Sequence, residues 1–162
     1  MHKIAPFLWF DKNAEEAMNF YVDIFNGSPG KTADSKIVSI RRYEKGMDAP
    51  GMPEMEGKVL TGVFELNGQK FMALDGGAQD WQFNEGLSMY VECEDQSEID
   101  YFYEKLSAVP ESEICGWLKD KYGLSWQINP KNMDELTKTN EQINAMLKMK
   151  KIIIADLEKA AN

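Results

Sequence analysis

The sequence predicts an α+β protein built from two copies of a βαβββ unit, the second abbreviated, with a C-terminal helical extension. Three observations lead to this prediction. Residues 4–75 show the pattern of a strand, a helix and three further strands. Residues 87–130 begin in the same order, and the Phe20-Tyr21 pair of the first helical segment returns as Phe102-Tyr103. A pattern repeated within one chain indicates one supersecondary unit used twice.

The first copy opens on an apolar run of strand length, Ile4–Phe10, which is followed by the polar residues DKN. Asn13 can cap the helix that begins there. Apolar residues then recur at helical spacing and predict a face packed on a core: Ala14, Ala17, Met18, Tyr21, Ile24 and Phe25. Three strands are expected next, within 36–44, 58–66 and 69–75.

The second copy begins with residues 87–95, in which apolar and polar side chains alternate as in a strand with one buried face. Asp95 or Ser97 can cap the following helix. Its predicted buried positions are Ile99, Phe102, Tyr103 and Leu106. Two strands complete this copy and turn near Tyr122-Gly123.

We expect one domain over residues 1–162, because this length fits a single hydrophobic core. Its expected parts are module one at about 3–75, a linker at 76–86, module two at about 87–130 and a C-terminal helical tail at 131–162. Ile152–Ile154 are three consecutive apolar β-branched residues, so the tail should dock on a partner or on its own core.

Composition excludes several classes of function. A formal net charge of −9 disfavours a nucleic-acid partner, because phosphates would be repelled. No apolar run is long enough to span a membrane, and Asp11 interrupts the first apolar stretch too early for a signal peptide. We therefore expect a cytoplasmic protein that binds neither membrane nor nucleic acid. A Ser/His/Asp site is not supported, because the only histidine is His2.

Five stretches of the chain together resemble the PhnB-like family, which is also labelled the 3-demethylubiquinone-9 3-methyltransferase domain. This family lies within the glyoxalase, bleomycin-resistance and extradiol-dioxygenase (vicinal oxygen chelate) superfamily. The resemblance extends from Ile4 to about Leu157 and rests on FLWFDKNAEEAMNFYVDIF, FMALDGG, FNEGLSMYVECED, CGWLKDKYGLSWQI and AMLKMKK. It implies paired βαβββ modules whose sheets surround a cavity, in a homodimer.

The same resemblance locates the metal ligands of the superfamily's metal-dependent enzymes on the first and last strands of each module. At those places this chain has Ala5 or Pro6, Ala73, Ser88 and Gln127. None of these is a good ligand for a divalent ion. We therefore expect neither a metal nor another cofactor. The alternative is that nearby carboxylates serve as the metal ligands instead: Glu65, Asp75, Glu85 and Glu92.

Aromatic and polar residues on the predicted strands favour a pocket for a small, mostly apolar ligand with a polar end. The expected lining is Phe7, Trp9, Phe71, Ser88, Tyr90, Trp117 and Gln127, with Lys119 at its edge. The alternative for each aromatic residue is core packing, and for Gln127 a hydrogen bond within the sheet. Methionines in the loop 46–57 could form a lid, or the loop could be a mobile surface segment without a role.

Two main hypotheses for the function follow. The first is a metal-free homodimer that binds a small molecule in the manner of bleomycin-resistance relatives. The second is an enzyme of the same superfamily, either a divalent-metal lyase or dioxygenase or the methyltransferase that the family label implies. A Gly-rich nucleotide-binding turn is not found in the sequence, which weakens the methyltransferase reading. A third alternative is a structural homodimer whose cavity is filled by its own side chains.

Overall fold

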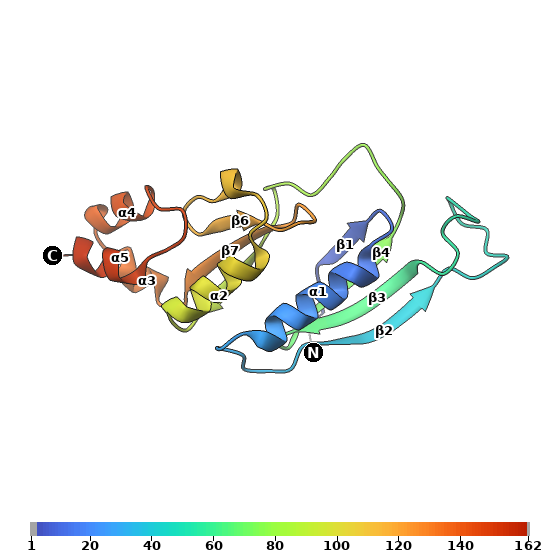
Figure 1. Cartoon of the computed structure of the whole chain (residues 1–162), viewed down its shortest axis with the longest axis horizontal. Coiled ribbons are helices and arrows are strands. Elements are labelled where there is room, and N and C mark those ends of the chain that lie inside the picture. Colours follow the sequence, from blue (N-terminus) through green and yellow to red (C-terminus); the bar gives the residue numbers. More distant parts are fainter. Residues whose placement is uncertain (1–2, 162) are drawn as a thin grey trace. The chain divides into compact units, whose positions relative to one another are not determined.

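Figure 1 shows the computed structural model of the chain, in which residues 3–161 are described. The chain divides into two compact units, and we describe each by itself. The first unit comprises the residues up to Gly27 together with Lys31–Trp81. The second unit comprises Ser28–Gly30 and the chain from Gln82 onward. Across the described part, no helix is long and apolar enough to cross a membrane.

The first unit is one helix packed on a four-stranded mixed sheet. Its elements are β1 (Phe7–Phe10), α1 (Ala14–Gly27), β2 (Lys36–Arg42), β3 (Val59–Leu66) and β4 (Gln69–Asp75). The strand order is β1-β4-β3-β2, with β1 parallel to β4 and the other pairs antiparallel. This is the predicted βαβββ unit.

Helix α1 buries the six side chains that the sequence pattern assigned to its inner face. It lies close to the sheet at Gly62, because a Cβ at that position would be 2.6 Å from Sδ of Met18. The helix begins directly after Asn13, as predicted. Its first amide, that of Ala14, donates to the Oδ1 carboxylate oxygen of Asp75 at 2.8 Å. Asp75 therefore ties the start of α1 to the end of β4.

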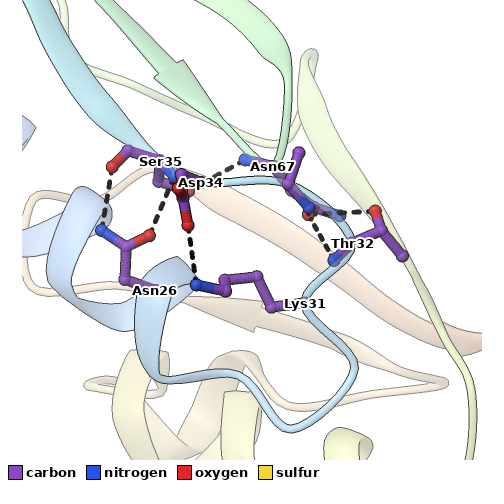
Figure 2. Close-up of polar contacts among 7 residues, drawn as sticks. Asn26, Lys31, Thr32, Asp34, Ser35 and Asn67 are labelled. Carbon is purple, nitrogen blue, oxygen red and sulfur yellow. Dashed lines mark hydrogen bonds and ion pairs between the residues drawn. The ribbon is translucent and has the colours of Figure 1, made fainter.

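Two asparagine side chains fix the connection between α1 and β2, as Figure 2 shows. Asn26 accepts from the amide of Ser35 at 2.8 Å and donates to its carbonyl at 2.9 Å. Oδ1 of Asn67 accepts from the amides of Thr32 and Ala33 at 2.9 and 2.8 Å. Asn67 and the following glycine both have positive φ, as a two-residue hairpin turn between β3 and β4 requires.

The second unit repeats the strand order of the first but lacks its outermost strand. It contains β5 (Ser88–Cys93), α2 (Gln96–Leu106), the 3-10 turn η1 (Pro110–Ser112), β6 (Trp117–Lys119) and β7 (Ser125–Pro130). The sheet order is β5-β7-β6, with β5 parallel and β6 antiparallel to β7. Asp95 caps α2, whose four predicted inner residues are all buried. The second copy is therefore abbreviated, as the sequence predicted.

The C-terminal tail folds as three short helices: α3 (Met133–Leu136), α4 (Asn140–Met146) and α5 (Ile154–Ala160). They pack around a small apolar cluster formed by Leu136, Ile152 and Leu157. The amides of Cys115 and Gly116 donate to the carbonyls of Met149 and Lys150. The tail thus docks on its own chain, which was one of the two alternatives.

Candidate functional site

One face of the second unit's sheet is covered by α2, and the other face carries the polar residues that the sequence singled out. Leu118, Trp126 and Ile128 on the covered face are at most 1% exposed. Because side chains alternate along a strand, Ser125 and Gln127 lie on the opposite face. We call this opposite side the open face.

Strand pairing arranges the open face in rows. Directly paired residues point to the same side of a sheet, so each row takes one side chain from each strand. The first row is Ser88, Ser125 and Lys119. The second row is Tyr90, Gln127 and Trp117. Four of the predicted pocket residues, Ser88, Tyr90, Trp117 and Gln127, are thereby brought together within this unit.

The Gln127 side chain joins the two rows. Its Nε2 donates to Oγ of Ser88 at 2.9 Å. This bond is the within-sheet contact that the sequence left as an alternative to ligand binding. An amide carries a second N–H and an acceptor oxygen, and the serine hydroxyl still has its own hydrogen to donate. The Gln127–Ser88 pair is therefore positioned by an internal hydrogen bond and keeps donors and an acceptor that can bond a ligand.

Tyr90 is the most accessible aromatic side chain of the open face, with 52% exposure. Partial burial of its hydroxyl raises the pKa, and the nearby charge of Glu92 adds to this, whereas a hydrogen bond with Asn129 acts in the opposite direction. The phenol therefore stays protonated at neutral pH and can donate a hydrogen bond as well as offer its ring.

An ion pair closes the first row at its outer end. Nζ of Lys119 lies 2.5 Å from Oε1 of Glu85, which belongs to the linker before β5. The hydrogen bond from Lys119 holds the pKa of Glu85 below its ordinary value. Beside this pair, Oγ of Ser125 is buried without a hydrogen-bond partner among the described residues, as is Oδ1 of Asn129, which pairs with Glu92 beyond the second row.

In the first unit, Phe7 and Trp9 lie on the sheet face that α1 does not cover, with 48% and 36% exposure. The Trp9 ring makes an edge contact with Trp81, with 5.4 Å between ring centroids. Its Nε1 donates to the carbonyl of Gly77 at 3.2 Å. A Cβ at Gly76 would lie 2.1 Å from the Trp9 ring, so the indole rests directly on that glycine's backbone.

Phe71 lies on the other face of this sheet. It is 7% exposed and stacks on Phe64 in the core, with 5.4 Å between ring centroids. In the β1–β4 register, Phe7 pairs with Met72 and Trp9 pairs with Leu74, so Phe71 points away from both aromatic residues. Ala73 is also on the covered face and is fully buried. Phe71 was expected to line the pocket, but it packs in the core, which was the alternative given for each aromatic residue.

Three of the candidate carboxylates have structural partners: Asp75 bonds backbone amides, Glu85 pairs with Lys119 and Glu65 pairs with Lys36. Asp75 is 1% exposed, and its two oxygens accept from the amides of Ala14 and Val59. A second buried carboxylate, Asp120, was missed by the sequence reasoning. It accepts from the amides of Tyr122 and Leu124 and from the indole of Trp126. The only available signal was an aspartate just before the expected turn at Tyr122-Gly123.

The residues present do not fit the metal centre that the superfamily implies. Between residues 3 and 161, no three His, Cys, Asp or Glu side chains are grouped so that they could hold a metal ion. His2 lies outside the described residues. On the open face, the Ser88 hydroxyl and the Gln127 amide are bonded to each other, and this pair lacks the anionic or imidazole groups that divalent ions prefer.

Comparison with known proteins identifies related chains. A family model described as 3-demethylubiquinone-9 3-methyltransferase matches residues 2–129. The solved structure of the PhnB protein from Bacillus cereus is 39% identical, covers 78% of this chain and 98% of its own, and gives a TM-score of 0.61. Protein PA1353 from Pseudomonas aeruginosa is 19% identical with a TM-score of 0.59, over 81% of this chain and 98% of its own, and supports the fold alone. No curated protein matches.

Proposed function

The chain belongs to the 3-demethylubiquinone-9 3-methyltransferase family, whose PhnB-like members have the glyoxalase-like fold, and on that premise we propose that it is a metal-free small-molecule-binding protein. The proposal rests on the second row of the open face. There, Gln127 lies between the aromatic side chains of Tyr90 and Trp117 and is held by its bond to Ser88. Apolar walls with a few fixed polar groups are typical of small-ligand sites.

The proposed ligand is small and mostly apolar, with a polar end. The rings of Tyr90 and Trp117 supply apolar contact area at a low cost in side-chain entropy. The amide of Gln127 can both donate and accept, so it would orient a polar group on the ligand. Phe7 and Trp9, which the sequence also predicted as pocket residues, are exposed on the first unit.

Methyl transfer, which the family description names, is the alternative function. Both sheets are mixed, whereas the usual methyltransferase cofactor site is a Gly-rich turn in a doubly wound parallel sheet. Titration with S-adenosylmethionine by calorimetry tests this alternative. Saturable binding at micromolar concentration would favour the enzyme over the binding protein.

We also propose that the protein is a homodimer, as its family resemblance implies, and that it is cytoplasmic, as we expected from its sequence. Native mass spectrometry of freshly purified protein, with elemental analysis of the same sample, tests the metal-free state, the dimer and a retained ligand together. The expected result is a metal-free dimer with an additional small mass. A stoichiometric metal would contradict the proposed chemistry, and a monomer at micromolar concentration would contradict the dimer.

Replacing Gln127 with Leu tests the site itself. The side chains have similar volume, so the fold should persist while the affinity for a retained ligand falls about tenfold, because a hydrogen bond in a desolvated site is lost. Gln69→Leu, on the exposed end of β4, is the matched control and should leave the affinity unchanged. Equal affinities of the two variants would contradict the proposed site.

A further inference from the structure

The first row of the open face gathers hydrogen-bond donors at one level of the sheet. Ser88 on β5, Ser125 on β7 and Lys119 on β6 are directly paired across adjacent strands. Two hydroxyls and an ammonium group therefore point to the same side. Donors of this kind, with one fixed positive charge, are suited to an anionic oxygen group.

The hydroxyl of Ser125 supports this reading independently. The residue is 1% exposed, and its Oγ has no hydrogen-bond partner within the described residues. A buried polar atom without a partner is unfavourable and is uncommon in folded proteins. An acceptor on a bound molecule would supply the missing bond at this position.

The neighbouring ion pair shows that a carboxylate fits beside the row. Glu85 contacts Nζ of Lys119 at 2.5 Å, yet it leaves Ser125 without a partner. The Glu85 side chain is 62% exposed, whereas that of Lys119 is 25% exposed. A ligand carboxylate could replace this exposed partner on the ammonium group and also accept from the hydroxyls, which Glu85 does not do.

The second row sets the size of the rest of the ligand. Tyr90 and Trp117 lie on either side of the central strand, which separates their backbones by about 10 Å at ordinary strand spacing. One aromatic ring over Gln127 would contact both side chains. The two rows are two residues apart along a strand, or roughly 7 Å. A chain of a few methylenes would span that distance between ring and anion.

We infer that the first row binds the anionic end of the ligand and that the ligand class is an aryl-alkyl carboxylate with its ring on the second row. This inference rests on the proposed function, because it identifies the ligand class of the same site. The carboxylate contacts Lys119, Ser125 and Ser88 and is the polar group that the Gln127 amide orients, whereas the ring contacts Tyr90 and Trp117. When no ligand is bound, Glu85 is the ion-pair partner of the Lys119 ammonium group.

Isothermal calorimetry with 4-phenylbutyrate and its neutral amide, 4-phenylbutanamide, tests the inference on the full chain. The acid should bind about tenfold more tightly than the amide, because only the acid makes a charge-assisted bond. Equal affinities would contradict the inference and leave the proposed function standing. Failure of both compounds to bind at millimolar concentration would contradict the inference and the proposed site together.

Variants assign the difference to particular residues. Lys119→Met should weaken the acid about tenfold and leave the amide unchanged, whereas Lys121→Met, two residues away, should change neither affinity. Ser125→Ala should weaken the acid about threefold and keep the fold, because it removes a buried hydroxyl that has no partner. Acid affinities equal to wild type in both site variants would overturn the inference.

Glu85→Gln gives the opposite expectation. Removing the internal competitor for Lys119 should strengthen acid binding about threefold, as expected for loss of one exposed ion pair. Glu111→Gln, an exposed residue of η1 with the same change of charge, should have no comparable effect. Weaker acid binding in Glu85→Gln, or an equal gain in Glu111→Gln, would contradict the assigned role of Glu85.

Discussion

The two units share one arrangement of strands but differ at its outer edge. In each, the opening strand is parallel to the closing strand, which pairs on its other side with an antiparallel neighbour. The first unit adds β2 beyond that neighbour, while the second ends at the three-residue β6 and has only the short turn η1 before it. The inner three strands and one helix are therefore the repeated element, and the fourth strand is optional.

The units differ more in chemistry than in topology. The uncovered face of the first sheet presents Phe7 and Trp9, whereas the open face of the second presents hydroxyl, amide and ammonium groups. Each unit nevertheless has a buried carboxylate that accepts from two backbone amides, Asp75 in the first unit and Asp120 in the second. The buried structural carboxylate therefore recurs in both copies, while the candidate recognition groups are concentrated in the second unit.

The largest expected effects come from the two buried carboxylates. Asp120→Ala should lower the free energy of unfolding by about 4 kcal/mol and Asp75→Ala by about 3 kcal/mol, because three and two buried donors lose their acceptor. Urea denaturation measures both. Amide hydrogen exchange should increase mainly around β7 in the first variant and around β3 and β4 in the second. An equal increase in hydrogen exchange throughout the chain would contradict the division into two units.

A smaller effect is expected for Gly76→Ala, which tests the aromatic face of the first unit. The new methyl group would overlap the Trp9 ring, so the ring must shift, and its contact with Trp81 must change. We expect a loss of about 1–3 kcal/mol and a reduced near-ultraviolet circular dichroism signal from the tryptophan pair. Gly77→Ala, where a Cβ has open space but φ is positive, should keep that signal. An unchanged signal in Gly76→Ala would show that this contact is not fixed.

The smallest effect concerns the ion pair that ties α1 to β2, the strand that the second unit lacks. Glu15 contacts Arg42 at 2.7 Å, and this hydrogen bond holds the pKa of Glu15 below its ordinary value. A carboxylate whose folded pKa is depressed contributes stability above its unfolded pKa and loses it as pH falls through the folded value. Wild type should therefore lose this small contribution below about pH 4.5, and Glu15→Gln should not. Parallel pH profiles of stability in the two proteins would refute this role.

Repeated elements were predictable from the sequence because their signals are local. Helical spacing identified the buried face of α1, and strand alternation placed Trp126 and Gln127 on opposite faces of the sheet. The abbreviated second copy also followed from counting strands. The predicted grouping of Ser88, Tyr90, Trp117 and Gln127 needed only strand order and register. Three pairings place them together within one unit: Tyr90 and Trp117 each pair with Gln127, and Ser88 pairs with Ser125.

Side-chain partners far apart in the chain were not predictable. Asp75 was an alternative candidate metal ligand, but it accepts from the amide of Ala14, which is 61 residues away. Phe71 was placed in the pocket because it is aromatic and lies on a strand, yet the register with β1 turns it toward the core. A sequence pattern shows how side chains alternate between the two faces of one strand. Only the pairing of strands decides which residues of neighbouring strands share a face of the sheet.

The proposal that the second unit's open face recognises a small molecule is tested most directly by nuclear magnetic resonance. Titration of ¹⁵N-labelled protein with 4-phenylbutyrate should shift the side-chain amide signal of Gln127 and the indole N–H signal of Trp117, with one saturation curve for both. The indole signal of Trp126, on the face covered by α2 and bonded to Asp120, should stay in place as an internal reference. Saturation elsewhere in the chain while the Gln127 and Trp117 signals remain unmoved would contradict the account.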